Sequence, residues 1–275
     1  MREFQGIVIA HAAAYGGMIS NFGGTIARRL VEEGAELHFF ASNLPVFGCE
    51  PPVRALEGLG GTFHGLTLPE SLSPGRDIAA IVSMARSLRR LRVQLLHTRG
   101  SVMGLVGRMA GRLAGVPVLV HHQDDLYSRD HRFWRIGRRL VGAAEAALSS
   151  MSHAAFFVSQ TVLDDALSLG FRRKACVLVG IDFNRVFLRT AGPGQRHRLL
   201  RACGIDDDAL VVGSIARLVE WKGIDTLIEA ARVLCAEIPR CRFFIKGDGP
   251  LRELLAERIR RLGLTGRVFL CSEEI

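Results

Sequence analysis

The sequence lacks any apolar run that could cross a bilayer, because none reaches the ~18–20 residues that a spanning helix needs. After Met1 it also lacks the apolar region and small-residue cleavage site of a secretory signal. The six cysteines form no Cys-x-x-Cys pair, which argues against a metal site and a disulfide framework. The sequence is not poor in hydrophobic residues, since they make up 48% of its 275 residues, and this excludes a disordered chain. A globular, cytoplasmic protein with reduced cysteines is expected.

The charge balance is strongly basic. Lysine and arginine number 36 against 27 aspartates and glutamates, which gives a formal net charge of +9. Such a balance favours polyanionic partners, namely nucleic acid, acidic lipid headgroups or phosphorylated small molecules. No nucleic-acid-binding motif accompanies the charge, so nucleic acid is not expected as a partner.

Short apolar runs alternate with amphipathic stretches along the chain. The apolar runs predict strands, and the stretches with apolar residues at helical spacing predict helices. The predicted strands lie near 6–11, 35–41, 61–66, 93–97, 116–122, 154–158, 175–179, 209–215, 242–246 and 267–271. The predicted helices lie near 23–33, 76–91, 103–114, 133–148, 225–236 and 251–262. This alternation predicts an α/β fold with parallel sheets covered on both faces.

A glycine- and proline-rich break at 189–194 divides the chain, and the polar residues after it complete the composition of a linker. We therefore expect an N-terminal Rossmann-like domain over residues 1–190, with the boundary near Thr190, and a C-terminal domain over residues 191–275. The second block holds at most three strand–helix units, whereas a doubly wound domain usually has five or six strands. The second domain is therefore expected to be incomplete.

Glycines follow the first predicted strand. Gly16-Gly17 and then Gly23-Gly24 stand between that strand and the next helix. Glycines at such a turn let backbone amides approach an anionic ligand, although a plain turn is the alternative. The spacing is not Gly-x-Gly-x-x-Gly, so a nicotinamide-dependent oxidoreductase is not favoured.

Two cations follow the first predicted strand of the second block. The segment 213–223 reads Gly-Ser-Ile-Ala-Arg-Leu-Val-Glu-Trp-Lys-Gly and carries Arg217 at the strand end and Lys222 at the mouth of the next helix. Cations beside a helix N-terminus favour a diphosphate, and solvated loop cations are the alternative. A second turn, Ile-Lys-Gly-Asp-Gly-Pro at 245–250, ends the next strand. Its Asp248 fits either a helix N-cap or a ligand contact.

The order of these pieces resembles the second domain of retaining nucleotide-sugar glycosyltransferases of family 4, also called group 1, which have the GT-B fold. The family pattern is Gly-x-x-x-Arg-Leu-x-x-x-Lys-Gly, then a Thr-Leu-Ile-Glu-Ala helix, a Gly-Asp-Gly-Pro-Leu-Arg turn and a Leu-Gly-Leu entry to a strand. All four pieces stand here in order, at 213–223, 226–230, 247–252 and 262–270. The resemblance implies two Rossmann-like domains that face each other across a cleft.

The N-terminal half resembles the same family more loosely. Gly16-Gly17 match its first-loop glycines, and the strand at 118–122 ends in a histidine as the family strand does. The turn Gly180-Ile181-Asp182 also matches, with Val179 where the family usually has asparagine. Either His121 or His122 is the family histidine, and we take His122.

The resemblance implies that a sugar moves, with retention, from a nucleotide-sugar donor to a cell-envelope glycan, such as lipopolysaccharide, or to a lipid-linked acceptor. In this interpretation the expected catalytic residues are Arg217 and Lys222, which stabilise the leaving diphosphate, and His122, which lies near the donor sugar. The expected donor site comprises Gly16, Gly17, Arg217, Lys222, Gly247 and Asp248. No cofactor and no metal are expected, and Asp206-Asp207-Asp208 is interpreted as a solvated turn.

The family also carries two glutamates, separated by seven residues, that contact the donor sugar and the nucleotide ribose. Glu229 and Glu237 have this spacing but lie on the helix after Lys222, so we interpret them as surface charges. The family pair is expected beyond Ile275, and residues 1–275 alone are expected to bind donor and transfer sugar poorly. The alternative function is a truncated or degenerate, non-catalytic member that binds a nucleotide or a partner.

Arginine clusters at two predicted helices leave a membrane contact open. One cluster ends the helix at 76–91, and the other surrounds the helix at 133–148, which also has an apolar face. A basic amphipathic helix can rest on anionic lipid, and an ordinary surface helix is the alternative. We expect a cytoplasmic protein, with a peripheral contact at the inner face of the membrane as one interpretation.

The donor sugar, nucleobase, acceptor and linkage stay open, and acceptor recognition is expected in the loops at 43–57 and 124–131.

Overall fold

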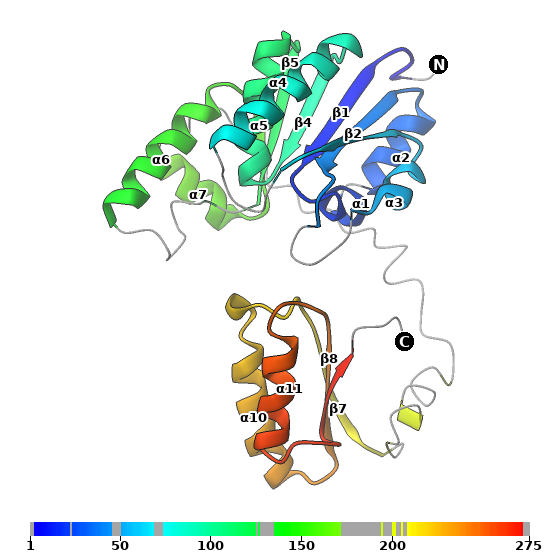
Figure 1. Cartoon of the computed structure of the whole chain (residues 1–275), viewed down its shortest axis with the longest axis vertical. Coiled ribbons are helices and arrows are strands. Elements are labelled where there is room, and N and C mark those ends of the chain that lie inside the picture. Colours follow the sequence, from blue (N-terminus) through cyan, green and yellow to red (C-terminus); the bar gives the residue numbers. More distant parts are fainter. Residues whose placement is uncertain are drawn as a thin grey trace. The chain divides into compact units, whose positions relative to one another are not determined.

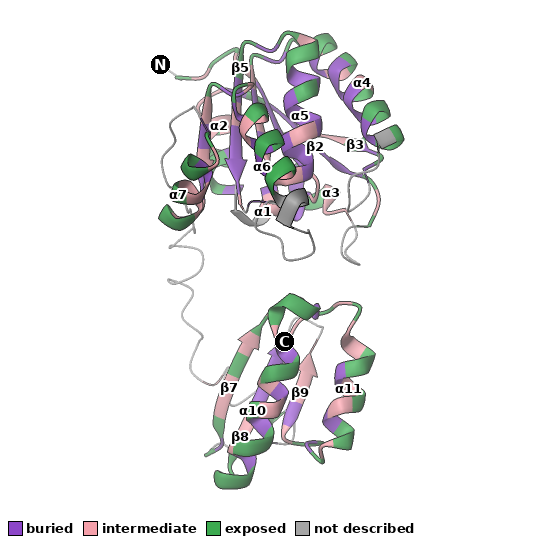
Figure 2. Ribbon diagram, turned by 90° about the vertical axis from the view of Figure 1, so that its left-hand side faces the viewer, coloured by how far each residue is buried: buried purple, intermediate pink, exposed green. Residues whose placement is uncertain are grey.

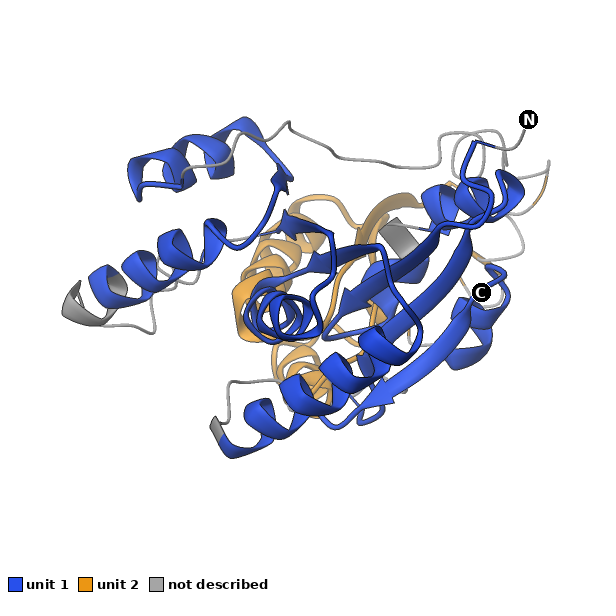
Figure 3. Cartoon of the chain, turned by 90° about the horizontal axis from the view of Figure 1, so that it is seen from above, with its two compact units in different colours: residues 1–182 blue, residues 183–275 orange. Residues whose placement is uncertain are grey.

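The computed structural model describes residues 3–22, 24–45, 51–68, 74–124, 126, 135–171, 194, 200–201, 205 and 208–271. The chain divides into two compact units, residues 1–182 and 183–275, and each has a parallel sheet of its own (Figure 1). Figure 3 distinguishes the two units by colour. The expected boundary near Thr190 lies outside the described residues, as do the strand expected at 175–179 and the turn at 180–182.

The first unit contains a six-stranded sheet in the order β3-β2-β1-β4-β5-β6, with parallel neighbours. The order reverses between β1 and β4. Open α/β sheets bind ligands at such a reversal, outside the carboxyl ends of the strands. The strands are β1 Val8–Ala13, β2 Glu36–Ser42, β3 Thr62–Leu66, β4 Leu95–Arg99, β5 Val118–Gln123 and β6 Ala154–Phe157.

The helices of this unit are α1 Gly17–Phe22, α2 Gly24–Glu32, α3 Val53–Glu57, α4 Pro74–Arg90, α5 Ser101–Ala114, α6 Arg135–Ser149 and α7 Gln160–Ser168. The hydrophobic pattern predicts α2, α4, α5 and α6 to within two residues at each end, but it misses α1, α3 and α7. With 6 and 5 residues, α1 and α3 are too short to display a helical period. Gly115 ends α5 with a φ of +77°, and its N–H donates to the Arg112 carbonyl.

Buried apolar side chains pack on both faces of this sheet. Phe40 and Leu96 contribute to a core that includes Leu88 of α4, whereas Phe39 packs into the core that includes Ala27 of α2. Figure 2 shows the buried strands beneath helices whose outer faces are exposed. Burial on both faces explains why these strands read as continuous apolar runs in the sequence.

The second unit contains a parallel sheet of three described strands in the order β7-β8-β9. Its elements are β7 Leu210–Ile215, the 3-10 helix η2 Glu220–Lys222, α10 Ile224–Glu237, β8 Cys241–Lys246, α11 Arg252–Arg261 and β9 Val268–Cys271. Ile228 of α10 and Leu255 of α11 are fully buried in one core with Phe243 of β8. The prediction of an α/β chain with two parallel sheets is confirmed.

Candidate functional site

Two loops meet at the carboxyl edge of the second sheet. One leads from β7 through Arg217 to η2, and the other leads from β8 through Asp248 to α11. Three backbone hydrogen bonds join them: Ala216 N–H donates to the Lys246 carbonyl (3.0 Å), Leu218 N–H to the Asp248 carbonyl (2.9 Å) and Leu251 N–H to the Leu218 carbonyl (3.1 Å). The loop that carries Arg217 is therefore held in place by the loop that carries Asp248.

Glycines at 247 and 249 permit this close approach. A Cβ on Gly249 would lie 2.6 Å from the Leu218 carbonyl oxygen, and a Cβ on Gly247 would collide with the Ala216 carbonyl. Because both obstacles are backbone atoms, any side chain at either position would push the loops apart. The structure thus gives Gly247 a packing role, and its contact with a donor stays a prediction.

Asp248 is not the N-cap of α11. That helix begins at Arg252, its N-cap is Leu251, and no side chain caps its first amides. The exposed Asp248 side chain instead accepts a 2.8 Å hydrogen bond from the N–H of Gly249. The N-cap alternative is therefore wrong, because the carboxylate bonds the next amide three residues before the cap. Its ligand contact stays a prediction.

Arg217 and Lys222 stand on one short segment between β7 and α10. Arg217 is half-buried, and its guanidinium carbon lies 5.7 Å from the centre of the Trp221 ring. Lys222 is exposed at the end of η2. Gly223, with a φ of +62°, turns the chain into α10, and no side chain caps that N-terminus. The segment therefore presents two cations beside the positive end of a helix dipole.

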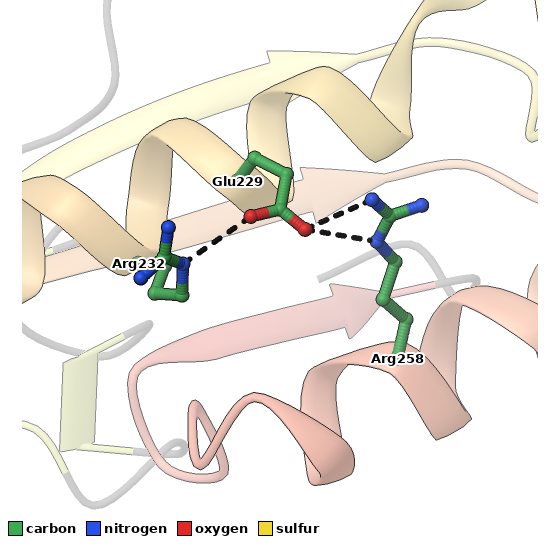
Figure 4. A network of polar contacts seen from close by, with 3 residues as sticks. All are labelled: Glu229, Arg232 and Arg258. Atoms are coloured by element: carbon green, nitrogen blue, oxygen red, sulfur yellow. Dashed lines mark hydrogen bonds and ion pairs between the residues drawn. The ribbon is translucent and has the colours of Figure 1, made fainter.

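Glu229 lies on α10 and joins it to α11 (Figure 4). Its Oε1 accepts hydrogen bonds from Nη2 (2.8 Å) and Nε (3.3 Å) of Arg258, and its Oε2 accepts one from Nε of Arg232 (3.3 Å). The hydrogen bonds from Arg258, and then the one from Arg232, lower the pKa of Glu229. Glu229 therefore lies on the helix after Lys222, as expected, and links two helices, and its interpretation as a surface charge rather than a ligand contact stays a prediction.

The glycine pair of the first unit lies where the strand order reverses. β1 leads into α1, which begins at Gly17, and the N–H of Ile19 donates to the Gly16 carbonyl (2.9 Å). A Cβ on Gly16 would lie 3.0 Å from the Leu56 side chain and 3.1 Å from Pro52, so the missing side chain lets this turn pack against α3. The structure therefore places both glycines at the carboxyl edge of the sheet, where they were expected to meet a donor.

An ion pair lies at the same edge. Arg99, at the end of β4, donates from Nη2 to Oδ1 of Asp124 (2.7 Å) and from Nε to Oδ2 (3.1 Å). This two-point contact fixes the residue that follows β5. Sequence reasoning missed the pair because its members are far apart in the chain, one at the end of β4 and the other directly after β5.

His121 and His122 occupy opposite faces of the sheet, because successive strand residues alternate. His121 is fully buried, with Nδ1 2.8 Å from the Thr98 hydroxyl and Nε2 2.8 Å from Oε1 of Gln123. His122 is also buried, but no hydrogen bond reaches its Nε2 in the part of the chain that the structure describes. Of these two histidines, His122 thus has a ring nitrogen without a hydrogen-bond partner among the described residues, and its contact with a donor stays a prediction.

Two further histidines share the face of His122, and sequence reasoning missed them. His11 on β1 and His97 on β4 are paired in register, and their Nδ1 atoms lie 3.1 Å apart. The rings of His97 and His122 are 6.1 Å apart. Burial lowers the pKa of His11 to about 4, and burial followed by the neighbouring histidines holds the pKa of His97 well below 6.5. The imidazoles are therefore neutral at pH 7.

No group of three or more His, Cys, Asp or Glu side chains within the described ranges is placed to hold a metal ion. Residues 206–208 were expected to form a solvated turn, and of these three aspartates the structure describes Asp208, which is exposed. Cys235 and Cys241 are buried thiols.

The family follows from comparison with known proteins. Residues 20–181 match the glycosyl transferase 4-like domain, and residues 195–273 match the glycosyl transferases group 1. The first match alone covers more than half of the chain. The chain therefore belongs to the group 1 glycosyltransferases, also called family 4.

The curated relatives of this chain include two named glycosyltransferases. The chain is 38% identical over 190 residues to UDP-Gal:alpha-D-GlcNAc-diphosphoundecaprenol alpha-1,3-galactosyltransferase of Escherichia coli, which covers 67% of this chain and 48% of the relative. It is 30% identical over 200 residues to 2-deoxystreptamine N-acetyl-D-glucosaminyltransferase of Streptomyces fradiae, which covers 69% of this chain and 47% of the relative. The chain thus spans about half the length of the curated relatives it matches.

Solved structures show the fold. Sucrose-phosphate synthase from Thermosynechococcus elongatus superposes with a TM-score of 0.70 and 18% identity, over 98% of this chain and 71% of that one. A glycosyltransferase from Rickettsia africae gives a TM-score of 0.68 at 14% identity, over 98% and 68%. The expected GT-B fold is confirmed. Among the described helices, none has the length and apolar character to cross a membrane.

Proposed function

We propose that this protein transfers a sugar from a nucleotide-sugar donor to an acceptor, with retention at the sugar carbon. The observation that supports this most is the segment 217–222, which sets two cations beside the N-terminus of α10 within the stretch that matches the group 1 family. When the glycosidic bond breaks, negative charge builds on the departing diphosphate. Fixed cations and amides aimed at that charge lower the barrier.

Each site residue has a role in this proposal. Arg217 and Lys222 bind the diphosphate as its charge develops. His122 lies near the donor sugar, and because burial, followed by Arg99, lowers its pKa, its neutral imidazole bonds a sugar hydroxyl. The remaining donor contacts come from Gly16, Gly17, Gly247 and Asp248. The reaction needs no cofactor.

The acceptor that we propose is lipid-linked or belongs to the cell envelope. The Escherichia coli relative is named for a GlcNAc-diphosphoundecaprenol acceptor. With an acceptor of that class, we propose that the enzyme works at the cytoplasmic face of a membrane. The exposed side chains of Arg86, Arg89 and Arg90 on α4 offer positive charge to anionic lipid.

The test is a transfer assay with the full-length protein, since residues 1–275 alone are expected to transfer sugar poorly, with a panel of UDP-, GDP- and TDP-sugars and polyprenyl-diphosphate-linked acceptors. We expect a product whose anomeric configuration, read by NMR, matches that of the donor. An inverted product would contradict the proposed stereochemistry, and no transfer or nucleotide release with any donor would contradict the proposed activity.

A matched pair of variants tests the site. Lys222→Ala should lower turnover at least ~10-fold, because an ionic contact to the leaving group is lost. Arg240→Ala removes an exposed cation that directly precedes β8, at the opposite edge of the same sheet, and should leave turnover unchanged. Equal turnover in Lys222→Ala and the unaltered chain would remove Lys222 from the proposal.

A further inference from the structure

Trp221 stands in the sequence between Arg217 and Lys222, the two cations of the proposed site. It keeps 63% of its surface exposed on η2. Exposure alone carries no argument, since single apolar side chains on a surface are common. Its neighbour is informative: the guanidinium carbon of Arg217 lies 5.7 Å from the ring centre, within the ~6 Å range of a cation–π interaction. Tryptophan is the strongest aromatic partner for such a contact.

The backbone that carries this pair is fixed by hydrogen bonds. The N–H of Val219 donates to the Arg217 carbonyl (3.0 Å), and the N–H of Lys222 donates to the Val219 carbonyl (3.1 Å). The bond from Leu218 to Asp248 anchors the same segment to the loop after β8. The Arg217 backbone is therefore held by its neighbours, and the ring contact constrains the far end of the side chain.

We propose that Trp221 is a positioning residue that holds the Arg217 guanidinium in one orientation before a diphosphate arrives. The inference rests on the proposed function, because it concerns the arginine assigned there to the leaving group. A ring contacts the face of a guanidinium, so the ring itself does not occupy the N–H donors at the edge. A carboxylate in the same place would occupy those donors and offset the charge that a diphosphate requires. Trp221 thus orders Arg217 without competing for its ligand.

The direct test measures motion of the Arg217 side chain in the full chain without ligand. Nitrogen-15 relaxation of its Nε–H, assigned by comparison with Arg217→Lys, should show restricted motion and an upfield ring-current shift. Trp221→Leu should increase the motion and remove the ring-current shift, whereas Trp221→Phe should keep most of the restriction. Val233→Ala, which shortens another exposed apolar side chain of this unit, is the matched control and should change neither. Equal mobility of Arg217 in the unaltered chain and in Trp221→Leu would overturn the proposal.

Calorimetry with UDP and with inorganic pyrophosphate separates this inference from the proposed function. Arg217→Ala should weaken UDP binding by about 10- to 100-fold, as expected for a lost charged hydrogen bond. Trp221→Leu should weaken it by about 2- to 5-fold, and Trp221→Phe by less than about 2-fold. In the Arg217→Ala background, Trp221→Leu should cause no further loss.

The outcomes of these measurements distinguish the positioning role of Trp221 from the proposed role of Arg217. An equal loss from Trp221→Leu with and without Arg217 would overturn the positioning role, because the tryptophan would then act independently. UDP and pyrophosphate binding that is indifferent to Arg217→Ala would overturn the proposed role of Arg217 in the reaction. In that case the relaxation measurement alone decides whether Trp221 orders the side chain.

Discussion

The N–H of Leu218 donates a 2.9 Å hydrogen bond to the carbonyl of Asp248 and ties the loop after β7 to the loop after β8. The two loops come so close that a Cβ on Gly249 would lie 2.6 Å from the Leu218 carbonyl oxygen. Arg217 directly precedes Leu218, so its backbone position depends on a glycine of the neighbouring loop.

Gly249→Ala should therefore damage both the fold and the site. The added methyl group forces the loops apart, which should lower the free energy of unfolding by about 1–3 kcal/mol and weaken UDP binding. Gly213→Ala is the matched control in the same unit, because a Cβ there meets nothing within 4 Å. Denaturant titration and calorimetry measure the two effects. Equal unfolding free energies in the two variants would contradict the loop contact.

Glu229→Gln should separate a structural glutamate from a ligand-binding one. The change removes the negative charge that faces Arg258 and Arg232, so the midpoint of thermal unfolding should fall slightly. UDP affinity should stay the same, because Glu229 connects α10 to α11. Glu237→Gln, on the same helix and exposed, is the control for loss of a surface charge. A loss of UDP affinity in Glu229→Gln alone would contradict the purely structural role of Glu229.

The fold and the second-unit site could be predicted from sequence because both are encoded locally. The buried strand β8 reads as an apolar run around Phe243, and the amphipathic helices between strands show their period. Arg217, Lys222 and Gly223 stand within a few residues of one another, so a single segment reveals the cations and the helix start. The pattern also distinguishes the two units by their number of strands.

The missed features depend on strand register, side-chain conformation and packing, which the local sequence pattern does not encode. The pairing of His11 with His97 requires the register of β1 against β4, which neither strand encodes by itself. The Arg217–Trp221 contact depends on side-chain conformations, although both residues stand in the segment 213–223. Asp248 satisfied the residue preference of an N-cap, yet α11 starts later because the preceding turn packs against the Leu218 backbone.

The buried histidines predict that acid destabilises the first unit. Burial lowers the pKa of His11 from 6.5 to about 4. Between these values the unfolded chain binds a proton that the folded chain does not, so stability falls as pH falls from about 6.5 towards about 4. For His11 the loss is on the order of 3 kcal/mol. Denaturant unfolding at a series of pH values measures it.

His11→Asn is the control for that pH dependence. Asparagine keeps a polar atom near the position of Nδ1, which faces Nδ1 of His97, and it does not titrate. The unfolding free energy of this variant should change less between pH 6.5 and 4 than that of the unaltered chain. Identical pH slopes would show that the imidazole of His11 is not the group responsible.

The adjacent residues His121 and His122 should respond in opposite ways to the same substitution. His121→Phe leaves the polar atoms of Thr98 and Gln123 buried without their imidazole partner, which should cost about 1–3 kcal/mol of unfolding free energy. His122→Phe removes an Nε2 atom that no hydrogen bond reaches in the described residues, so its stability cost should be smaller.

Turnover should show the reverse order. If His122 bonds a hydroxyl of the donor sugar, His122→Phe should lower transfer about 10-fold or more, because a buried hydrogen bond to the substrate is lost. His121→Phe, assayed well below its unfolding temperature, should transfer at close to the normal rate, since both ring nitrogens of His121 already have partners within the sheet. Parallel measurements of unfolding and sugar transfer decide between the two histidines. A stable, active His122→Phe beside a stable, inactive His121→Phe would assign the donor contact to His121 and contradict the face on which we place it.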